Sequence, residues 1–145
     1  MLISNDKARF DYEILETLEA GIVLAGYEVK GIRSGKGSIK GSYVKILGGE
    51  AYIVGAQIAP YQPGNVPADY DPQRTRKLLL KKSELKYLIG KAEERGLTLV
   101  PLKIFDAHGL LKLSIGIARG KKKYDKRETI KSRENKRTIS RALKS

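Results

Sequence analysis

The chain has 145 residues, which fits one domain with a hydrophobic core of its own. It contains no cysteine, which excludes thiol catalysis, cysteine zinc sites and disulfide bonds, and no apolar run approaches the roughly 20 residues that span a bilayer. Lys and Arg number 29 against 16 Asp and Glu, so the net charge is +13 and the expected partner is a polyanion. The charged N-terminus does not resemble a secretory signal, and we expect a cytoplasmic protein.

The first half of the chain predicts strands that are separated by glycines. Residues 12–24 alternate partly between apolar and polar side chains and predict one long strand that bends at Gly21. Residues 27–33 predict a short helix between two glycines. Residues 42–47 and 50–58 flank a Gly-Gly pair, which predicts a β-hairpin.

The middle of the chain predicts a loop, a strand and the clearest helix. Four of the five prolines fall within residues 60–72, which indicates one long exposed loop. Residues 76–80 predict a short strand. Apolar residues at helical spacing then predict a helix with Ser83 as its N-cap and Gly96 as the glycine that follows its end.

A second hairpin is predicted from residues 98–105 and 110–118, joined across residues 106–109. In its second strand, apolar residues alternate with polar ones such as Lys112, so one face is buried and the other exposed. Pro101 indicates an edge strand or a bulge, because proline cannot donate a hydrogen bond to a neighbouring strand.

These elements predict a mainly β fold, an OB-fold-like six-stranded antiparallel barrel with one or two short helices and one longer helix. We assign residues 1–118 to this barrel. Residues 119–145 carry 12 basic and 3 acidic residues, a net +9, with few large apolar side chains. This basic tail is predicted to be disordered when free, and it lacks the apolar face that would insert into a membrane.

Residues that could carry enzyme chemistry are sparse. The sole histidine, His108, lies in a predicted turn with no nucleophile or second acid indicated nearby. Asp69 and Asp71 lie in the proline-rich loop, where the role of turn residues is simpler than a metal site. The Gly-Lys-Gly segment at 35–37 is too short for a phosphate-binding loop. We therefore predict no enzyme active site, no metal and no cofactor.

Two basic segments are better candidates for function. Residues 74–77 (RTRK) enter a predicted strand, and residues 120–127 (GKKKYDKR) follow the last one. Lys and Arg contact phosphates, and Tyr124 offers a ring on which an unpaired base can stack. A single run of this kind is equally typical of a solvated charged surface. Two runs and a basic tail favour nucleic acid, so composition and pattern predict an RNA- or DNA-binding barrel with a basic arm.

Short motifs are spread along almost the whole chain, from about residue 5 to residue 143. In order they are KARFDY at 7–12, LEAGI at 18–22, EVK at 28–30, IAPY at 58–61, DP at 71–72, RTRKLLL at 74–80, GLTLVPL at 96–102, GKK at 120–122 and YDKR at 124–127. In this order they resemble the SmpB family (small protein B, also called SsrA-binding or tmRNA-binding protein). Gly31 and Phe10 depart from the family pattern, which usually has serine and often has histidine at these positions.

The resemblance implies an OB-like barrel that binds the tRNA-like domain of transfer-messenger RNA (tmRNA). It implies that alanyl-tmRNA, with elongation factor Tu, is delivered to the vacant A site of a stalled 70S ribosome. The barrel would stand in for the missing anticodon arm. The tail would meet 16S ribosomal RNA at the decoding centre, enter the empty mRNA channel and become helical there.

The resemblance and the basic segments together give the predicted site residues. In the family, RNA contact is associated with positions that correspond here to Glu19, Leu79 and Lys112. The full predicted RNA-binding set is Lys7, Arg9, Glu19, Arg74, Arg76, Lys77, Leu79 and Lys112. The predicted ribosome-binding tail residues are Lys121, Lys122, Tyr124, Asp125, Lys126, Arg127, Ile130, Lys131, Arg133, Lys136, Arg137 and Ile139.

Two other functions stay open at this point. One is a ribosomal protein or an initiation-factor-like OB module that never meets tmRNA. The other is a small RNA nuclease, which the missing acid–base set disfavours. Without the resemblance, Glu19 would be an ordinary exposed strand residue, Leu79 a core residue and Lys112 a solvated lysine.

Overall fold

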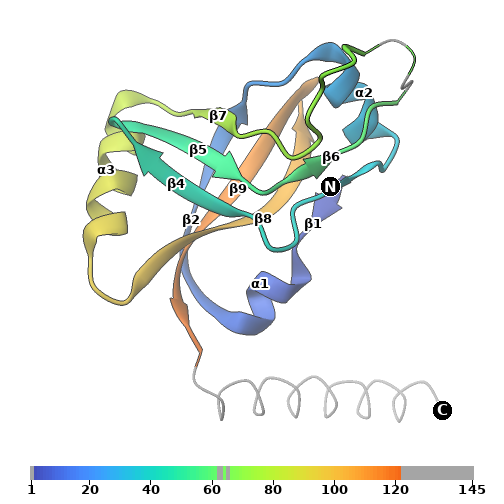
Figure 1. Ribbon diagram of the computed structural model, residues 1–145. Helices are drawn as coiled ribbons and strands as arrows, with labels where there is room; N and C mark the ends of the chain where they lie inside the picture. Colours follow the sequence, from blue (N-terminus) through green and yellow to red (C-terminus); the bar gives the residue numbers. More distant parts are fainter. Residues whose placement is uncertain (1, 62–63, 65, 122–145) are drawn as a thin grey trace, which may run out of the picture.

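Antiparallel strands make up most of the described part of the chain, and three helices accompany them there (Figure 1). The structure is a computed structural model that describes residues 2–61, 64 and 66–121. The helices are α1 (Asp6–Asp11), α2 (Gly26–Arg33) and α3 (Lys82–Glu93). The strands are β1 (Ile3–Ser4), β2 (Tyr12–Ile22), β3 (Gly37–Ser38), β4 (Tyr43–Leu47), β5 (Glu50–Val54), β6 (Gln57–Ile58), β7 (Arg76–Leu79), β8 (Leu97–Ala107) and β9 (Leu110–Gly120).

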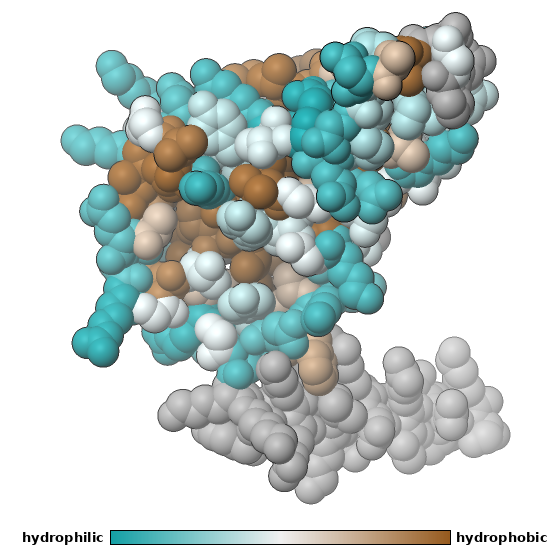
Figure 2. All heavy atoms as spheres, viewed as in Figure 1, coloured by the Kyte–Doolittle hydropathy of each residue, from teal (hydrophilic) through white to brown (hydrophobic). Residues whose placement is uncertain are grey.

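Seven strands form one sheet in the order β1-β8-β9-β2-β7-β5-β4, and β3 pairs separately with β6. The sheet coils until its edge strand β4 lies against β8, but no hydrogen-bonded ladder joins these two among the described residues. A groove of about 360 Å³ lies between β4, the end of α3 and β8 instead. Apolar surface ringed by hydrophilic side chains is visible on this side of the molecule (Figure 2). The mainly β, antiparallel prediction is confirmed, but the main sheet has seven strands rather than six.

The inner surface of the coiled sheet carries the main hydrophobic core. Alternate residues of β9 point into it, and Leu113, Ile115 and Ile117 are at most 1% exposed. From α3, Leu88 joins the same core and is completely buried. Burial of each such side chain stabilises the fold by about 1.5–3 kcal/mol. These contacts fix the strands that carry the candidate site.

A smaller hydrophobic cluster lies under α1, against β8 and β9. Its buried members are Ala8, Val100, Leu102 and Ala118. Asn5 holds α1 in place, because its side chain accepts the Ala8 N–H at 3.4 Å and donates to the Pro101 carbonyl at 2.9 Å. The sequence did not predict α1 or β1, since six helical residues are stabilised here by distant contacts rather than by local pattern.

Both predicted hairpins are present. Gly48 and Gly49 turn the first one with φ of +59° and +78°, which suits a two-residue turn between twisted strands. The second hairpin is tighter than predicted, because β8 continues to Ala107 and only His108 (φ 54°) and Gly109 (φ 86°) form the turn. The two-residue turn changes which residues of β8 and β9 lie opposite one another.

Two further details test the predicted boundaries. The register between β8 and β9 shifts between Pro101 and Lys103, which confirms the predicted bulge. Ser83 is not the N-cap of the helix. The Glu84 side chain accepts the Lys81 N–H at 3.1 Å, so Lys81 takes the cap position and α3 begins two residues earlier than predicted.

Candidate nucleic-acid interface

Strand pairing brings three of the predicted residues onto one side of the sheet. Gly21 of β2 lies opposite Leu79 of β7 and, on its other side, opposite Lys112 of β9. Lys112 in turn lies opposite Phe105 of β8. Directly paired residues point to the same side of a sheet, so these side chains form one row across four strands. We call the side that carries this row and Glu19 the outer face.

Glu19 belongs to the same outer face because it lies two residues before Gly21 in β2. It is exposed, whereas the intervening Ala20 is buried in the core. Leu79 is also an exposed apolar side chain, at 54%. The outer face thus combines a carboxylate, an exposed leucine and the ammonium group of Lys112 within two rows of the sheet.

Lys77 extends the outer face along β7, since it lies two residues before Leu79 and is exposed. Its ammonium group is 3.9 Å from the Glu50 carboxylate, at the limit of an ion pair. A surface pair of this kind contributes at most about 1 kcal/mol, so Lys77 is readily released to a phosphate.

The sequence missed two contributors to this surface, Lys103 and Phe105 of β8. The Lys103 ammonium group lies 5.5 Å from the centre of the Phe105 ring, and Phe105 pairs with Lys112. They were missed because the predicted four-residue loop hid the true register of the hairpin. A two-residue turn at His108 and Gly109 places Phe105 beside Lys112.

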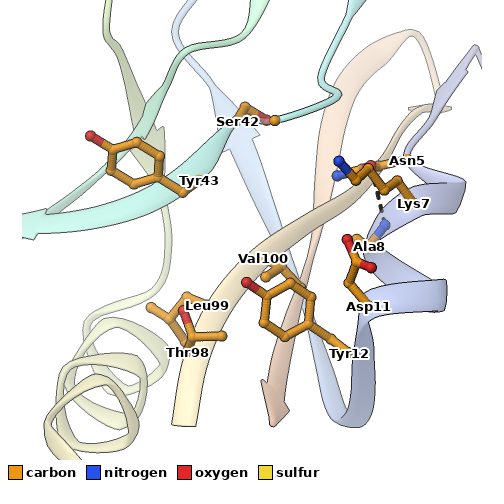
Figure 3. A pocket seen from close by; sticks show the side chains of 11 residues that line it. Asn5, Lys7, Ala8, Asp11, Tyr12, Ser42, Tyr43, Thr98, Leu99 and Val100 are labelled. Atoms are coloured by element: carbon orange, nitrogen blue, oxygen red, sulfur yellow. Dashed lines mark hydrogen bonds between the residues drawn. The ribbon is translucent and has the colours of Figure 1, made fainter. Parts of the chain in front are cut away.

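Lys7 and Arg9 lie elsewhere, on α1 before the start of β2. Tyr12 begins β2 and Glu19 lies near its other end, so a strand rise of about 3.3 Å per residue separates them by roughly 20 Å. Lys7 lines a cavity of about 290 Å³ that is bordered by Tyr12 and by Tyr43 of β4 (Figure 3). The structure therefore does not bring Lys7 and Arg9 together with Glu19.

Arg76 corrects one prediction, because its side chain is completely buried and cannot reach RNA. Its Nε donates to Glu28 at 2.8 Å, and the same carboxylate oxygen lies 2.7 Å from Nη2. The remaining N–H groups donate to the Ala56, Arg74 and Pro72 carbonyls and to the Tyr70 hydroxyl, at 2.9–3.2 Å. The guanidinium thus has a partner in every direction and holds the structure together. A run of basic letters does not reveal which side chains point inward.

Arg74 is half-buried and bonds to the same Glu28 carboxylate through Nε, at 3.0 Å, and through Nη2. Glu28 also accepts the Ala25 N–H at 2.9 Å and the Tyr70 hydroxyl at 3.0 Å. Arg74 is 35% exposed, so one edge of its guanidinium faces solvent, but its first role is to neutralise Glu28.

The acidity of Glu28 follows from these contacts. Burial alone would raise the pKa of its carboxyl group. The hydrogen bonds from Arg74, the Ala25 N–H and Arg76 outweigh burial and lower the pKa from 4.5 to about 2. Glu28 is therefore ionised at neutral pH and is a fixed anion inside the protein.

The remaining predicted features have simple positions. His108 is an exposed turn residue, and Asp71 accepts the Gln73 N–H at 2.9 Å within a turn. Lys121 donates its N–H to the Asp11 carbonyl at 2.9 Å. The other predicted tail residues, from Lys122 to Ile139, lie outside the described residues. Within the described part of the chain, no three His, Cys, Asp or Glu side chains are grouped to hold a metal ion, and no helix is long and apolar enough to cross a membrane.

Comparison with known proteins identifies the family. Residues 2–145 match the SmpB protein family. The chain belongs to the SmpB family. The SsrA-binding protein of Thermosynechococcus vestitus is 49% identical over 144 residues, which are 99% of this chain and 95% of that protein. The SsrA-binding protein of Acetivibrio thermocellus is 51% identical, over 99% of this chain and 93% of that protein.

A solved structure described as "tmRNA-SmpB: a journey to the center of the bacterial ribosome" also matches this SmpB-family chain. The two are 50% identical and superpose with a TM-score of 0.67, over 88% of this chain and 92% of that chain. The resemblance that the sequence motifs predicted is confirmed.

Because Glu28 is paired with Arg74 and Arg76, we expect the free energy of unfolding to fall at acidic pH. Because its pKa is lowered on folding, the stabilisation is complete above about pH 4.5 and is lost as the pH falls towards 2. The shift corresponds to about 3 kcal/mol. Glu28→Gln would leave Arg76 buried without a counter-charge, and we expect a loss of about 3–5 kcal/mol at pH 7. Denaturant unfolding from pH 7 to pH 2.5 measures both effects.

The exposed Glu13 of β2 provides a matched control, and Glu13→Gln should change the free energy of unfolding by less than about 0.5 kcal/mol. Wild-type stability in Glu28→Gln, with an unchanged acid profile, would show that the buried pair does not stabilise the fold.

Proposed function

We propose that this chain binds tmRNA and acts with it in the rescue of stalled bacterial ribosomes, the process of trans-translation, in the cytoplasm. The observation that carries the proposal is the full-length match to the SmpB family, together with the clustering of Glu19, Leu79 and Lys112 on the outer face. The chain acts by binding rather than as an enzyme, in keeping with its family.

The outer face is the proposed docking surface for the tRNA-like domain of tmRNA. Lys112 and Lys77 supply cations for phosphates, which give affinity for any RNA. A carboxylate is repelled by phosphate, so Glu19 is suited to accept a hydrogen bond from a base edge or from a ribose 2′-hydroxyl. The exposed Leu79 packs against an apolar ring or ribose face.

The coiled sheet, whose last strand β9 runs two residues past the expected boundary at 118 to Gly120, is proposed to act as a partly open OB-like barrel that takes the place of the anticodon arm. In this proposal, alanyl-tmRNA with the bound chain is delivered by elongation factor Tu to the vacant A site of a 70S ribosome. Lys7 and Arg9 lie at the far end of β2 from Glu19, so they are free to meet ribosomal RNA while the outer face holds tmRNA.

Residues 119–145 are proposed to be the part that tests whether the mRNA channel is empty. Their net charge of +9, from 12 basic and 3 acidic residues, suits a channel walled by 16S ribosomal RNA. Ile139, Ala142 and Leu143 have the spacing of one helical face, which favours a helix on binding. An mRNA in the channel would compete for the same space.

Copurification tests the proposed function against its alternatives. The tagged chain should enrich one long RNA with tRNA-like and message-like parts, as read by sequencing. Enrichment of ribosomal RNA alone would favour an ordinary ribosomal or initiation-factor-like module. Divalent-metal-dependent cleavage of labelled RNA would favour the nuclease.

Salt should weaken binding to the tRNA-like domain steeply. If six or more phosphates are neutralised, the affinity should fall by roughly 10³ or more between 50 and 200 mM salt, because displaced counterions drive binding. A filter-binding or fluorescence titration at several salt concentrations gives the slope. A nearly flat slope would contradict an interface dominated by phosphate contacts.

Glu19→Ala should weaken binding to the tRNA-like domain by roughly tenfold or more, since a buried hydrogen bond to RNA contributes about 1–3 kcal/mol. Glu19→Lys should retain affinity for unrelated RNA and lose its preference for the tRNA-like domain. The matched control is Glu13→Ala at the other end of β2, which should bind as wild type. Unchanged binding by a folded Glu19→Ala would remove Glu19 from the interface.

Truncation after Lys121 separates the two proposed parts of the chain. The cut leaves β9 and the bond from Lys121 to Asp11 intact, and both hydrophobic clusters lie before it. We expect tmRNA binding close to wild type and loss of peptide tagging on stalled ribosomes. Full tagging activity in the truncated protein would exclude a role for the tail in tagging. Equal loss of tmRNA binding and of tagging would show that the tail contributes to tmRNA binding.

A further inference from the structure

Gly21 is the next-to-last residue of β2 and is paired with a strand on each side, where a glycine weakens the sheet because it has no side chain to pack and more freedom to lose on folding. Several other described glycines have evident structural reasons, either a close neighbour or a positive φ. A Cβ on Gly31 would lie 2.1 Å from the Ala59 carbonyl oxygen, and one on Gly37 would lie 2.7 Å from Ile3. Gly49 has a φ of +78° that favours glycine.

None of these reasons applies to Gly21. Its φ lies outside the left-handed range, so other residues can adopt its backbone. A Cβ built there would be 3.4 Å from the Cβ of Leu79, which is at the short end of van der Waals contact and is not a clash. Alanine therefore meets no hard clash at this position, and neither the backbone conformation nor the packing requires glycine, which leaves its surroundings on the outer face as a reason for glycine.

The surroundings of Gly21 indicate what that reason is. Gly21 stands in the outer-face row between the exposed Leu79 and Lys112, so the row has a gap where the β2 backbone is uncovered. The gap is bordered by an apolar side chain, an ammonium group and, two residues earlier in β2, the carboxylate of Glu19. A nucleotide carries an apolar ring face, a phosphate and a 2′-hydroxyl, which match these three groups.

We propose that Gly21 is a specificity-determining residue whose missing side chain lets one ribonucleotide of the bound RNA lie against the β2 backbone, between Leu79 and Lys112. The inference rests on the proposed function, because it places that nucleotide in the tRNA-like domain of tmRNA. Close approach of a ligand to the main chain is a recurrent reason for glycine within a strand.

In the full-length protein, Gly21→Ala should affect stability and RNA affinity differently. The stability to denaturant should stay equal or rise, because alanine favours a strand more than glycine does. The affinity for the tRNA-like domain should fall by roughly tenfold or more, and Gly21→Val should lower it further because the longer side chain fills the gap. If glycine at this position served only the fold, Gly21→Ala would lower the stability of the protein instead.

Gly90→Ala is the matched control, since Gly90 lies in α3 with nothing within 4 Å of an added Cβ. It should raise stability through helix propensity and leave RNA affinity unchanged. Lower stability of Gly21→Ala would show that glycine is needed for the bend of β2, and it would overturn the inference. Wild-type affinity in a folded Gly21→Ala would also overturn it and leave the proposed function standing. Failure of the wild-type protein to bind the tRNA-like domain would overturn both.

Discussion

The fold depends on one buried ion pair between Glu28 of α2 and Arg76 of β7. Neither side chain is exposed, and the hydrogen bonds of Arg76 also reach carbonyls at Ala56 and Pro72. The pair thereby ties α2, the link between β5 and β6, the end of the proline-rich loop and the interior strand β7 to one point. Arg76 left there without the Glu28 carboxylate would be a buried charge with a large desolvation penalty, so it stabilises the structure only together with Glu28.

The ion pair between Glu28 and Arg76 also affects the outer face, because successive side chains of β7 point to opposite sides of the sheet. Arg76 and Leu78 point inward and are buried, whereas Lys77 and Leu79 point outward. Fixing Arg76 against Glu28 therefore fixes the direction in which Leu79 is presented beside Gly21. The short strand has only four residues, and its register would otherwise be held by a few ladder bonds to β2 and β5.

The sequence allowed much of this architecture to be predicted, since Gly-Gly turns, strand alternation and helical spacing are local signals. It also placed Glu19, Leu79 and Lys112 as candidates through family resemblance, and strand pairing joins their positions on one face. What failed depended on distant partners. Arg76 looked like a surface cation because its buried acid lies 48 residues away. The helix α1 was invisible because Asn5 is held by the Pro101 carbonyl, 96 residues away.

The composition of the outer face separates attraction from discrimination. Lysines draw in any polyanion, and adding more of them would raise affinity for all RNA alike. A carboxylate and a residue without a side chain act differently. The carboxylate lowers the attraction for RNA in general, and the glycine removes a packing contact. Each favours binding only when a particular group of the RNA occupies the space beside it. Glu19 and Gly21 stand two residues apart on the same side of β2, flanked by Leu79 and Lys112. The strand that is least basic at this face is therefore the one best suited to distinguish one RNA surface from another.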